Sequence, residues 1–354
     1  MYIVSGNGEN KMNVDNIYKN LVEEVLTEGN YKPNRTGVDT ISKFGVDYKI
    51  DNSESFPLLT TKKMDGFRWN SMIHELLWYL SGEHHIRNLR EKTGIWDAWA
   101  DEDGNLDTAY GRFWRRFPLP SYSGKIEGET WDDMEACYEN SSTSYDEESR
   151  WSFDQIQYVI DNLKENPNSR RHVVTAWHPA NAAVSTLPPC HLMFIFNVQN
   201  GNELNLHLTQ RSGDIALGIP FNIASYALLQ RMIANETGLQ PGEFHHTIVD
   251  AHVYCGEGER GGLYGEKLDH FQQFKIEGWH DLIQEHGLVY GDGEIPDNEN
   301  NYDHVPGLLE QIERWPKSPP KIEIADKPID DMEYDDIELK DYESHKGIKF
   351  GVAE

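Results

Sequence analysis

Basic residues, cysteines and long apolar runs are all scarce in this sequence. The 354 residues include 32 lysines and arginines against 60 aspartates and glutamates, and the formal net charge is −28. A surface this acidic repels phosphates, which argues against general nucleic-acid binding and against docking on an anionic membrane. The acidic residues are spread along the chain. This pattern favours a surface adapted to high salt over that of an ordinary acidic cytosolic protein.

Three cysteines, an odd number, do not make a disulfide framework, and a reducing compartment is expected. No apolar run is long enough to span a bilayer, so no membrane association is expected. The stretch from Met1 to Lys11 lacks the pattern of a signal peptide. We therefore expect a cytoplasmic protein, long enough for one large domain or two modest ones.

The spacing of apolar residues predicts a mixture of helices and strands. Helices are expected over residues 13–28, 71–80, 86–89, 153–163 and 221–237, and strands over 40–50, 192–198, 203–209 and 244–254. Asn200 and Gly201 predict a hairpin turn between two of these strands. Two acidic stretches, 121–152 and 257–303, are predicted to be surface insertions.

Cys190 follows two prolines and precedes an apolar strand. Proline fixes the backbone, so the thiol is held stiffly at the mouth of the strand, a suitable place for a nucleophile. The other interpretation is that a lone cysteine is a small buried hydrophobic residue. Arg211 and Asp214 come about twenty residues later, and Asn222 lies where the next helix is predicted to begin. The region therefore contains a thiol, a cation, a carboxylate and an amide.

Three motifs, in this order and at close spacing, resemble the thymidylate synthase family. They are Pro188-Pro189-Cys190-His191, Gln210-Arg211-Ser212-Gly213-Asp214, and the run from Leu217 to Leu229. Members of this family methylate dUMP with 5,10-methylenetetrahydrofolate as the consumed cosubstrate. The resemblance extends from about Ile17 to the C-terminus, interrupted by the two insertions. It implies an α+β fold, with residues 1–354 forming a single domain in which helices pack on a large mixed β-sheet. It also implies a homodimer in which two such sheets stack face to face.

The resemblance implies that Cys190 adds to C6 of the pyrimidine, which makes C5 nucleophilic. The residues implied to be catalytic are Cys190, Glu75, Tyr110, Asn222, Arg211 and Asp214. Glu75 and Tyr110 would serve the proton removed from C5, acting through water. Asn222 carries both a donor and an acceptor, which suits N3–H and O4 of uracil, whereas a carboxylate would suit cytosine. Its alternative role is to cap the helix.

The remaining site residues are also implied by the resemblance. The nucleotide would be bound by Arg35, Arg170, Arg171, Arg211, Ser212, Asn222, His252, Tyr254 and His191. Arg170 and Arg171 would reach the site of the partner subunit. The folate would be bound by Lys62, Ile95, Trp96, Trp99, Asp214, Leu217, Gly218, Phe221 and Ala353. No metal is expected, because the histidines show no ligand spacing.

Several positions depart from the usual family pattern. The family has Gln where Phe113 stands, Asn where His85 stands, and an apolar residue where Glu354 stands. The segment from Met64 to Asn70 is about three residues longer than usual. The nearest alternative function is a dUMP hydroxymethylase on the same scaffold, in which water traps the methylene group. Trp96 as a shield against water and Asn222 as the base reader favour methylation, and Glu354 weakens the argument from the tail.

Two further hypotheses belong to other classes. A cysteine hydrolase would use Cys190 with a histidine and would show acyl-enzyme burst kinetics without folate. A nucleotide-binding or RNA-regulatory module would lack turnover, and the joint presence of Cys190, Glu75, Tyr110 and Asn222 argues against it.

Overall fold

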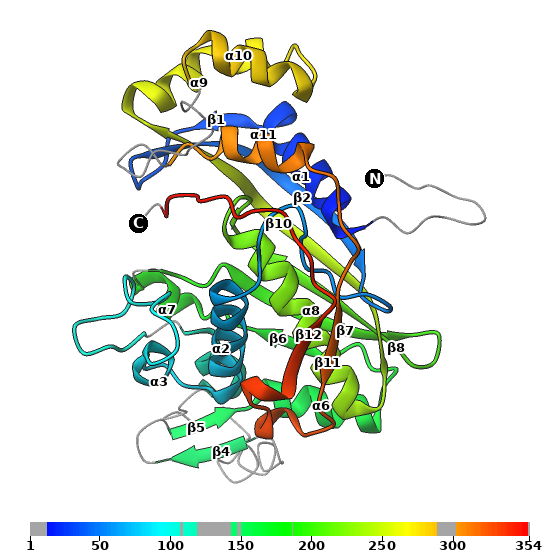
Figure 1. The fold of residues 1–354 in the computed structure, drawn as a ribbon. Helices are drawn as coiled ribbons and strands as arrows, with labels where there is room; N and C mark the ends of the chain where they lie inside the picture. The colour runs from blue at the N-terminus through cyan, green and yellow to red at the C-terminus, as the bar shows by residue number, and fades with distance from the viewer. Residues whose placement is uncertain are drawn as a thin grey trace.

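The computed structural model describes residues 13–106, 109–118, 143–146, 150–185, 187–288 and 302–352. A mixed β-sheet with the strand order β1-β2-β10-β8-β7-β6 lies at its centre (Figure 1). The short strand β9 pairs with β10 beyond the end of β8. The bounds are β1 Asn30–Lys32, β2 Val38–Asp51, β6 Val173–Thr175, β7 His191–Gln199, β8 Glu203–Gln210, β9 Gly213–Asp214 and β10 Gln240–Glu257. β10 is antiparallel to β2 and parallel to β8. The predicted α+β architecture with a large mixed sheet is confirmed.

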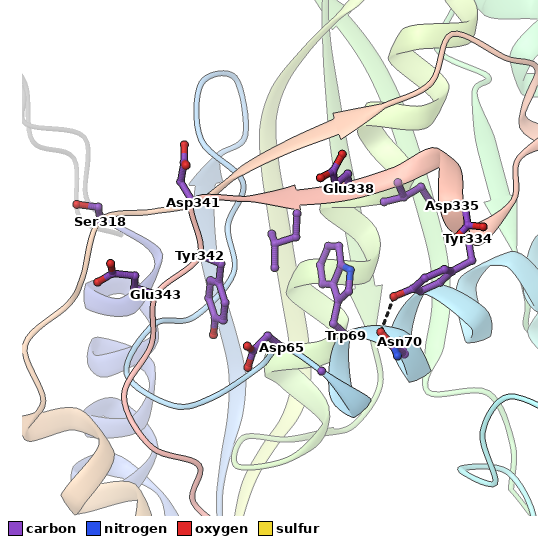
Figure 2. A pocket seen from close by; sticks show the side chains of 13 residues that line it. Asp65, Trp69, Asn70, Ser318, Tyr334, Asp335, Glu338, Asp341, Tyr342 and Glu343 are labelled. Atoms are coloured by element: carbon purple, nitrogen blue, oxygen red, sulfur yellow. Dashed lines mark hydrogen bonds between the residues drawn. The ribbon is translucent and has the colours of Figure 1, made fainter.

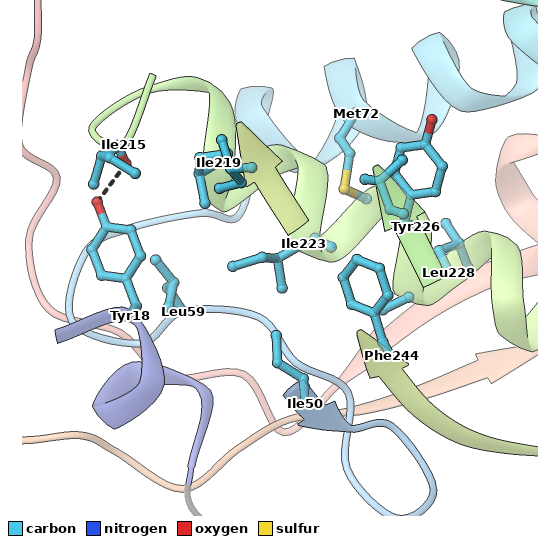
Figure 3. Close-up of a cluster of buried hydrophobic side chains, with 14 of the residues drawn as sticks. Tyr18, Ile50, Leu59, Met72, Ile215, Ile219, Ile223, Tyr226, Leu228 and Phe244 are labelled. Carbon is cyan, nitrogen blue, oxygen red and sulfur yellow. Dashed lines mark hydrogen bonds between the residues drawn. The ribbon is translucent and has the colours of Figure 1, made fainter. Parts of the chain in front are cut away.

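One face of the sheet carries the core. In β8, Leu204, Leu206 and Leu208 are buried, while the residues between them are half-buried on the opposite face. Helices cover the buried face, chiefly α1 Val14–Glu28, α2 Phe67–Ser81, α4 Tyr110–Arg115, α6 Gln155–Glu165 and α8 Gly218–Thr237. Figure 3 shows Ile219, Ile223 and Tyr226 of α8 in the hydrophobic cluster that also contains Phe244 of β10. The alternation expected of strands therefore places one residue in two against the helices.

Helix ends follow the local chemistry of the chain. The Asn13 side chain accepts the Asp15 N–H at 2.8 Å and caps α1. α8 ends at Gly238, whose φ of 69° is in the left-handed region that glycine adopts without strain. α2 begins at Phe67, four residues before the predicted start, because part of the longer segment joins the helix. α6 begins after Asp154, two residues late, because the residues before it pair as a strand.

The predicted turn at Asn200 and Gly201 is confirmed, with φ values of 51° and 88°. Part of the first acidic stretch forms strands, which the sequence did not predict. β3 Phe117–Pro118, β5 Arg150–Phe153 and β4 Thr143–Asp146 make a three-stranded sheet at the bottom of Figure 1. Most of that stretch, including Cys137, lies outside the described residues.

The second acidic stretch begins with helices at the top of Figure 1, the first of which packs against β1, β2 and β10. They are α9 Gly258–Phe271, the short 3₁₀ helix η1 Ile276–Gly278 and α10 Trp279–Glu285. Tyr264, Phe271 and Trp279 are fully buried there. These helices therefore extend the hydrophobic core, whereas the sequence predicted only a surface insertion here.

The C-terminal part returns to the main body. It comprises α11 Val305–Glu313, the β11 Lys321–Ile324 and β12 Ile337–Lys340 hairpin with 3₁₀ turns η3 Ile329–Asp331 and η4 Tyr334–Asp336, and a tail without regular structure. Two short helices, α3 Arg87–Arg90 and α7 Pro179–Val184, complete the described elements. None of the helices in the described part of the chain is long and apolar enough to cross a membrane.

Candidate active site around Cys190

Cys190 is the residue before β7, and Arg211 forms hydrogen bonds to the backbone around it. The Arg211 guanidinium donates to the carbonyls of Pro188 and Pro189 at 2.6 and 2.9 Å. The Arg211 backbone N–H donates to the Cys190 carbonyl at 2.8 Å, and the Cys190 N–H donates to the Tyr110 hydroxyl at 2.8 Å. Three predicted catalytic residues are thus joined by hydrogen bonds, and the thiol segment is fixed by its own backbone.

The electrostatics of the thiol result from two opposing effects. Burial raises the pKa of Cys190 above its ordinary value, while the nearby charges of Arg211 and Arg35 pull it down. Arg35 lies in the exposed turn between β1 and β2. The structure therefore brings two arginines, from segments far apart in the sequence, close enough to favour the thiolate.

Glu75 lies in α2, half-buried among aromatic rings. Its Oε1 accepts the Trp96 indole N–H at 2.7 Å. Burial raises the pKa of Glu75 from 4.5 to about 7, and hydrogen bonds from Tyr79 and Trp96 pull it partly back. The Trp96 ring lies 6.2 Å from that of Tyr110 and 5.6 Å from that of Trp99. A carboxyl group that titrates near neutral pH is suited to proton transfer in either direction.

Asn222 is held by a chain of polar groups. Its Oδ1 accepts from Gln210 Nε2 at 3.1 Å, and Gln210 Oε1 pairs with His246 Nε2 at 3.0 Å. His246 Nδ1 in turn pairs with the Tyr48 hydroxyl at 2.7 Å. The residue at the N-cap of α8 is Leu217, and Asn222 lies inside the helix, so the capping alternative for Asn222 is wrong.

Asp214 ends β9, just before α8. Its Oδ1 accepts the N–H groups of Ala216 and Leu217 at 2.9 and 3.2 Å. A Cβ on Gly218 would lie 3.9 Å from Asp214 Cβ and 3.7 Å from Asn222 Oδ1. Leu217, Gly218 and Phe221 are half-buried at this end of the helix. The carboxylate and the amide are therefore neighbours across one glycine.

His252 and Tyr254 lie on the same face of β10, with ring centres 5.2 Å apart. His252 is in register with Asp214 of β9. Burial raises the pKa of Tyr254 to about 12, and the charge of Arg35 acts against that rise. This pair consequently extends the cluster from Asp214 toward the turn that carries Arg35.

Lys62 is buried below the Asp214 segment. Its amine donates to the Ala216 carbonyl at 2.6 Å and lies 5.2 Å from the centre of the Phe350 ring. Burial lowers the pKa of Lys62 to about 7, against the attraction of Asp214. His191 stacks on Tyr110 with ring centres 4.7 Å apart, and burial lowers its pKa to about 4, which keeps the ring neutral.

The remaining predicted residues occupy more open positions. Ile95 and Trp99 are half-buried in the turn that also carries Trp96, and Ser212 accepts a bond from Gln210 through its carbonyl at 2.8 Å. Arg170 and Arg171 are exposed just before β6, and Arg171 lines a separate surface cavity of about 510 Å³. Ala353 and Glu354 lie outside the described residues.

Comparison with known proteins identifies the family of the chain. The family model described as thymidylate synthase matches residues 16–354. A thymidylate synthase of Haloferax volcanii is 57% identical over 337 residues, which cover 94% of this chain and 95% of that protein. The chain belongs to the thymidylate synthase family. The predicted membership is confirmed, and with it the assignment to a family of methyltransferases.

Two departures from the thymidylate synthase pattern have packing explanations. Phe113 is buried and packs beside Phe117 and His178, with ring centres about 6 Å away. His85 accepts the Arg87 N–H on Nδ1 at 3.0 Å, and its carbonyl accepts the Trp78 indole N–H at 3.4 Å. Both residues therefore serve the local structure around α3 and α4.

Two residues of the polar cluster around Asn222 were not predicted from the sequence. Gln210 and His246 are buried and orient Asn222. Each occupies an inward-facing position of a strand whose other inward residues are mostly apolar. A polar residue in that pattern was the available signal, because a buried polar group needs a partner.

A large cavity lies away from this cluster. It measures about 1070 Å³ and lies between β12 and the start of α2, with the carboxylates of Asp65, Glu338, Asp341 and Glu343 among its lining (Figure 2). The residues predicted for the nucleotide and the folate do not line it. Among the described residues, no group of three or more His, Cys, Asp or Glu side chains could hold a metal ion.

Proposed function

We propose that this protein catalyses the reductive methylation of dUMP to dTMP, with 5,10-methylenetetrahydrofolate as donor of both the carbon and the hydride. The Cys190 thiolate adds to C6 of uracil, and C5 then bonds to the methylene carbon. As C5 bonds, the methylene carbon loses one of its two bonds to folate nitrogen. Loss of the C5 proton then allows the remaining folate amine to leave, hydride transfer from the folate completes the methyl group, and elimination of the thiolate releases dTMP with dihydrofolate. Covalent addition replaces one difficult step with easier ones.

The observation that carries this proposal is the set of hydrogen bonds that connects the backbone around Cys190 to Arg211 and to the Tyr110 hydroxyl. A guanidinium that grips the backbone before the thiol positions the sulfur and favours its charged form. Glu75, with its pKa near neutral, would manage the C5 proton through water together with Tyr110. Asn222, oriented by Gln210, would read the uracil edge, and His191 would line the same pocket.

We assign the phosphate of dUMP to Arg35, Arg211 and Ser212, with Arg170 and Arg171 supplied by a partner subunit. Forked guanidinium groups suit phosphate, and close charges outweigh distant screened carboxylates. His252 and Tyr254 would hold the ribose hydroxyl. The homodimer is supported by the second face of the sheet, where Met193, Ile195 and similar residues are only half-buried in one chain.

We assign the folate to the opposite end of the cluster. Asp214 would bind the pterin, with Leu217, Gly218 and Phe221 beside it, and Ile95, Trp96 and Trp99 would cover the ring. Ala353 would contact it from the tail. Lys62 is assigned to the glutamate end, and its burial against Ala216 means that it would act from beneath the Asp214 segment.

We further propose a single domain over residues 1–354 in the cytoplasm, with a surface adapted to high salt. One continuous hydrophobic core from Val14 to Ile337 supports the single domain. The charge of −28 and the similarity to a Haloferax volcanii enzyme support the salt adaptation.

The test is an absorbance assay for dihydrofolate formation with dUMP and with dCMP over a range of salt, combined with the mass of the product. We expect turnover with dUMP and a product heavier by a methyl group. A product heavier by a hydroxymethyl group would contradict the methylation. The Cys190→Ala variant should lose turnover and keep dUMP binding, and undiminished turnover would refute the covalent mechanism.

A further inference from the structure

His304 lies where three parts of the site meet. It is the residue before α11 and is 1% exposed. Its backbone N–H donates to the Tyr254 carbonyl at 2.9 Å, and its ring lies between the rings of Tyr254 and Phe350, with centres 5.4 and 5.0 Å away. The position of the ring is therefore fixed by packing on both sides.

The two ring nitrogens of His304 face different partners. Nε2 pairs with the Gly351 carbonyl at 2.9 Å, and because a carbonyl only accepts, Nε2 carries the proton. Burial lowers the pKa of His304 below its ordinary 6.5, so the ring is neutral at pH 7 and Nδ1 holds a lone pair. Nδ1 is buried, has no hydrogen-bond partner among the described residues, and lies 3.8 Å from Asp214 Oδ1. The Nδ1 lone pair thus faces a carboxylate oxygen that already accepts two backbone N–H groups, so Nδ1 is the acceptor left without a donor, which a ligand would supply.

Several contacts anchor the tail, and among the described residues the bond to His304 is the one nearest the C-terminus. The His345 N–H donates to the Thr60 carbonyl at 2.8 Å, and Arg314 donates to the Lys346 carbonyl at 2.7 Å. Beyond them, the Gly351 carbonyl bonds to His304, and Phe350 packs over Gly307, where a Cβ would come within 2.7 Å of its ring. In the last stretch, the His304 imidazole and the space left by Gly307 both contribute to the position of the tail, together with the Lys62 amine beside Phe350.

We propose that His304 is a positioning residue for the folate. Its Nε2–H fixes the tail at Gly351, and its Nδ1 sets the acceptor geometry beside Asp214 for an N–H donor of the pterin. One ring thereby couples the closed tail to the pterin-binding carboxylate. This inference rests on the proposed function, because it assumes that Asp214 binds the folate.

The variants separate hydrogen bonding from packing. His304→Phe keeps a ring between Tyr254 and Phe350 but removes both nitrogens, whereas His304→Gln restores one donor and one acceptor. Gly307→Ala leaves His304 intact and displaces the tail through Phe350. Gly262→Ala in α9, where a Cβ would meet nothing within 4 Å, is the control for a helical glycine.

Two measurements are made on each full-length variant: the KM for methylenetetrahydrofolate against kcat, and hydrogen–deuterium exchange of the peptide 344–352 without ligand. We expect His304→Phe to raise the folate KM about tenfold, the loss of one hydrogen bond, and to speed exchange of the tail, with dUMP affinity unchanged. His304→Gln should recover most of both effects. Gly307→Ala should resemble His304→Phe, and Gly262→Ala should resemble the parent protein.

An unchanged folate KM in His304→Phe would overturn the proposal, as would an equal loss of dUMP affinity, since that indicates general damage. Tail exchange that stays as slow as in the parent would also overturn it. The exchange measurement needs no substrate. If the parent protein forms no dihydrofolate, the proposed function fails separately, while the bond from His304 to the tail is still tested.

Discussion

Replacing Glu75 with Gln should stabilise the protein at alkaline pH while reducing its turnover. In the folded protein, burial raises the pKa of Glu75 from 4.5 to about 7. The unfolded chain therefore loses this proton at a lower pH than the folded protein does. Glutamine keeps an oxygen to accept the Trp96 indole N–H but cannot ionise. The variant thus removes a cost that the parent protein bears whenever the carboxylate is charged.

The magnitude follows from linkage. The difference between about 7 and 4.5, at about 1.36 kcal/mol per pH unit, gives an upper figure of about 3 kcal/mol. Because the folded-state pKa is raised, the stabilising effect of the protonated group is fully present below pH 4.5 and is lost as the pH rises to 7. The advantage of Glu75→Gln should therefore grow from about 1 kcal/mol at pH 5.5 to about 3 kcal/mol at pH 8.5.

The assay is urea unfolding of both proteins at the two pH values, in the same high salt and at the same protein concentration, with kcat measured at pH 7.5. Linear extrapolation gives the free energies of unfolding. A gain that does not change between pH 5.5 and 8.5, or no gain at pH 8.5, would refute the reasoning. An unreduced kcat would separately refute the role in proton transfer.

Three further predictions follow from the contacts described. Trp96→Phe removes a bond that lowers the pKa of Glu75, so the Glu75 limb of the kcat–pH profile should move to higher pH. Arg260 pairs at 2.7 Å with the fully buried Asp303. Arg260→Met should therefore cost about 3 kcal/mol in urea unfolding, against less than about 1 kcal/mol for Arg90→Met in the exposed pair with Asp97. With a net charge of −28, the midpoint of thermal unfolding should rise with KCl, and a salt-independent midpoint would contradict salt adaptation.

The sequence predicted the features that depend on local pattern. The sequence located strands β7, β8 and β10 and helices α1 and α8, with errors mainly at the ends, from an apolar run before Val198, the hairpin turn at Asn200, the helical spacing in α1 and the glycine after α8. The motifs around Cys190 and Asn222 indicated the family that the comparisons confirm. These features were readable because a few neighbouring residues determine each of them.

Features that depend on contacts between residues far apart in the sequence could not be predicted from it. The burial of Gln210 is explained by His246, which lies 36 residues away, and that of His246 in part by Tyr48, 198 residues away. In the second acidic stretch, the glycines and carboxylates obscured three aromatic residues, which are buried where its helices meet β1, β2, β10 and α11. The contact of Lys62 with Ala216 likewise joins residues 154 positions apart.

The place of β10 in the sheet constrains the order in which the protein can assemble. β10 lies between β2 and β8, so the inner edge of β2 has no strand partner until residues 240–257 have been synthesised. During translation, the N-terminal hairpin of β1 and β2 must therefore wait with an unpaired edge while some two hundred residues follow. Contacts this far apart in sequence slow folding and expose chains to aggregation. The net charge of −28 makes nascent chains repel one another, which opposes aggregation while the edge of β2 is unpaired.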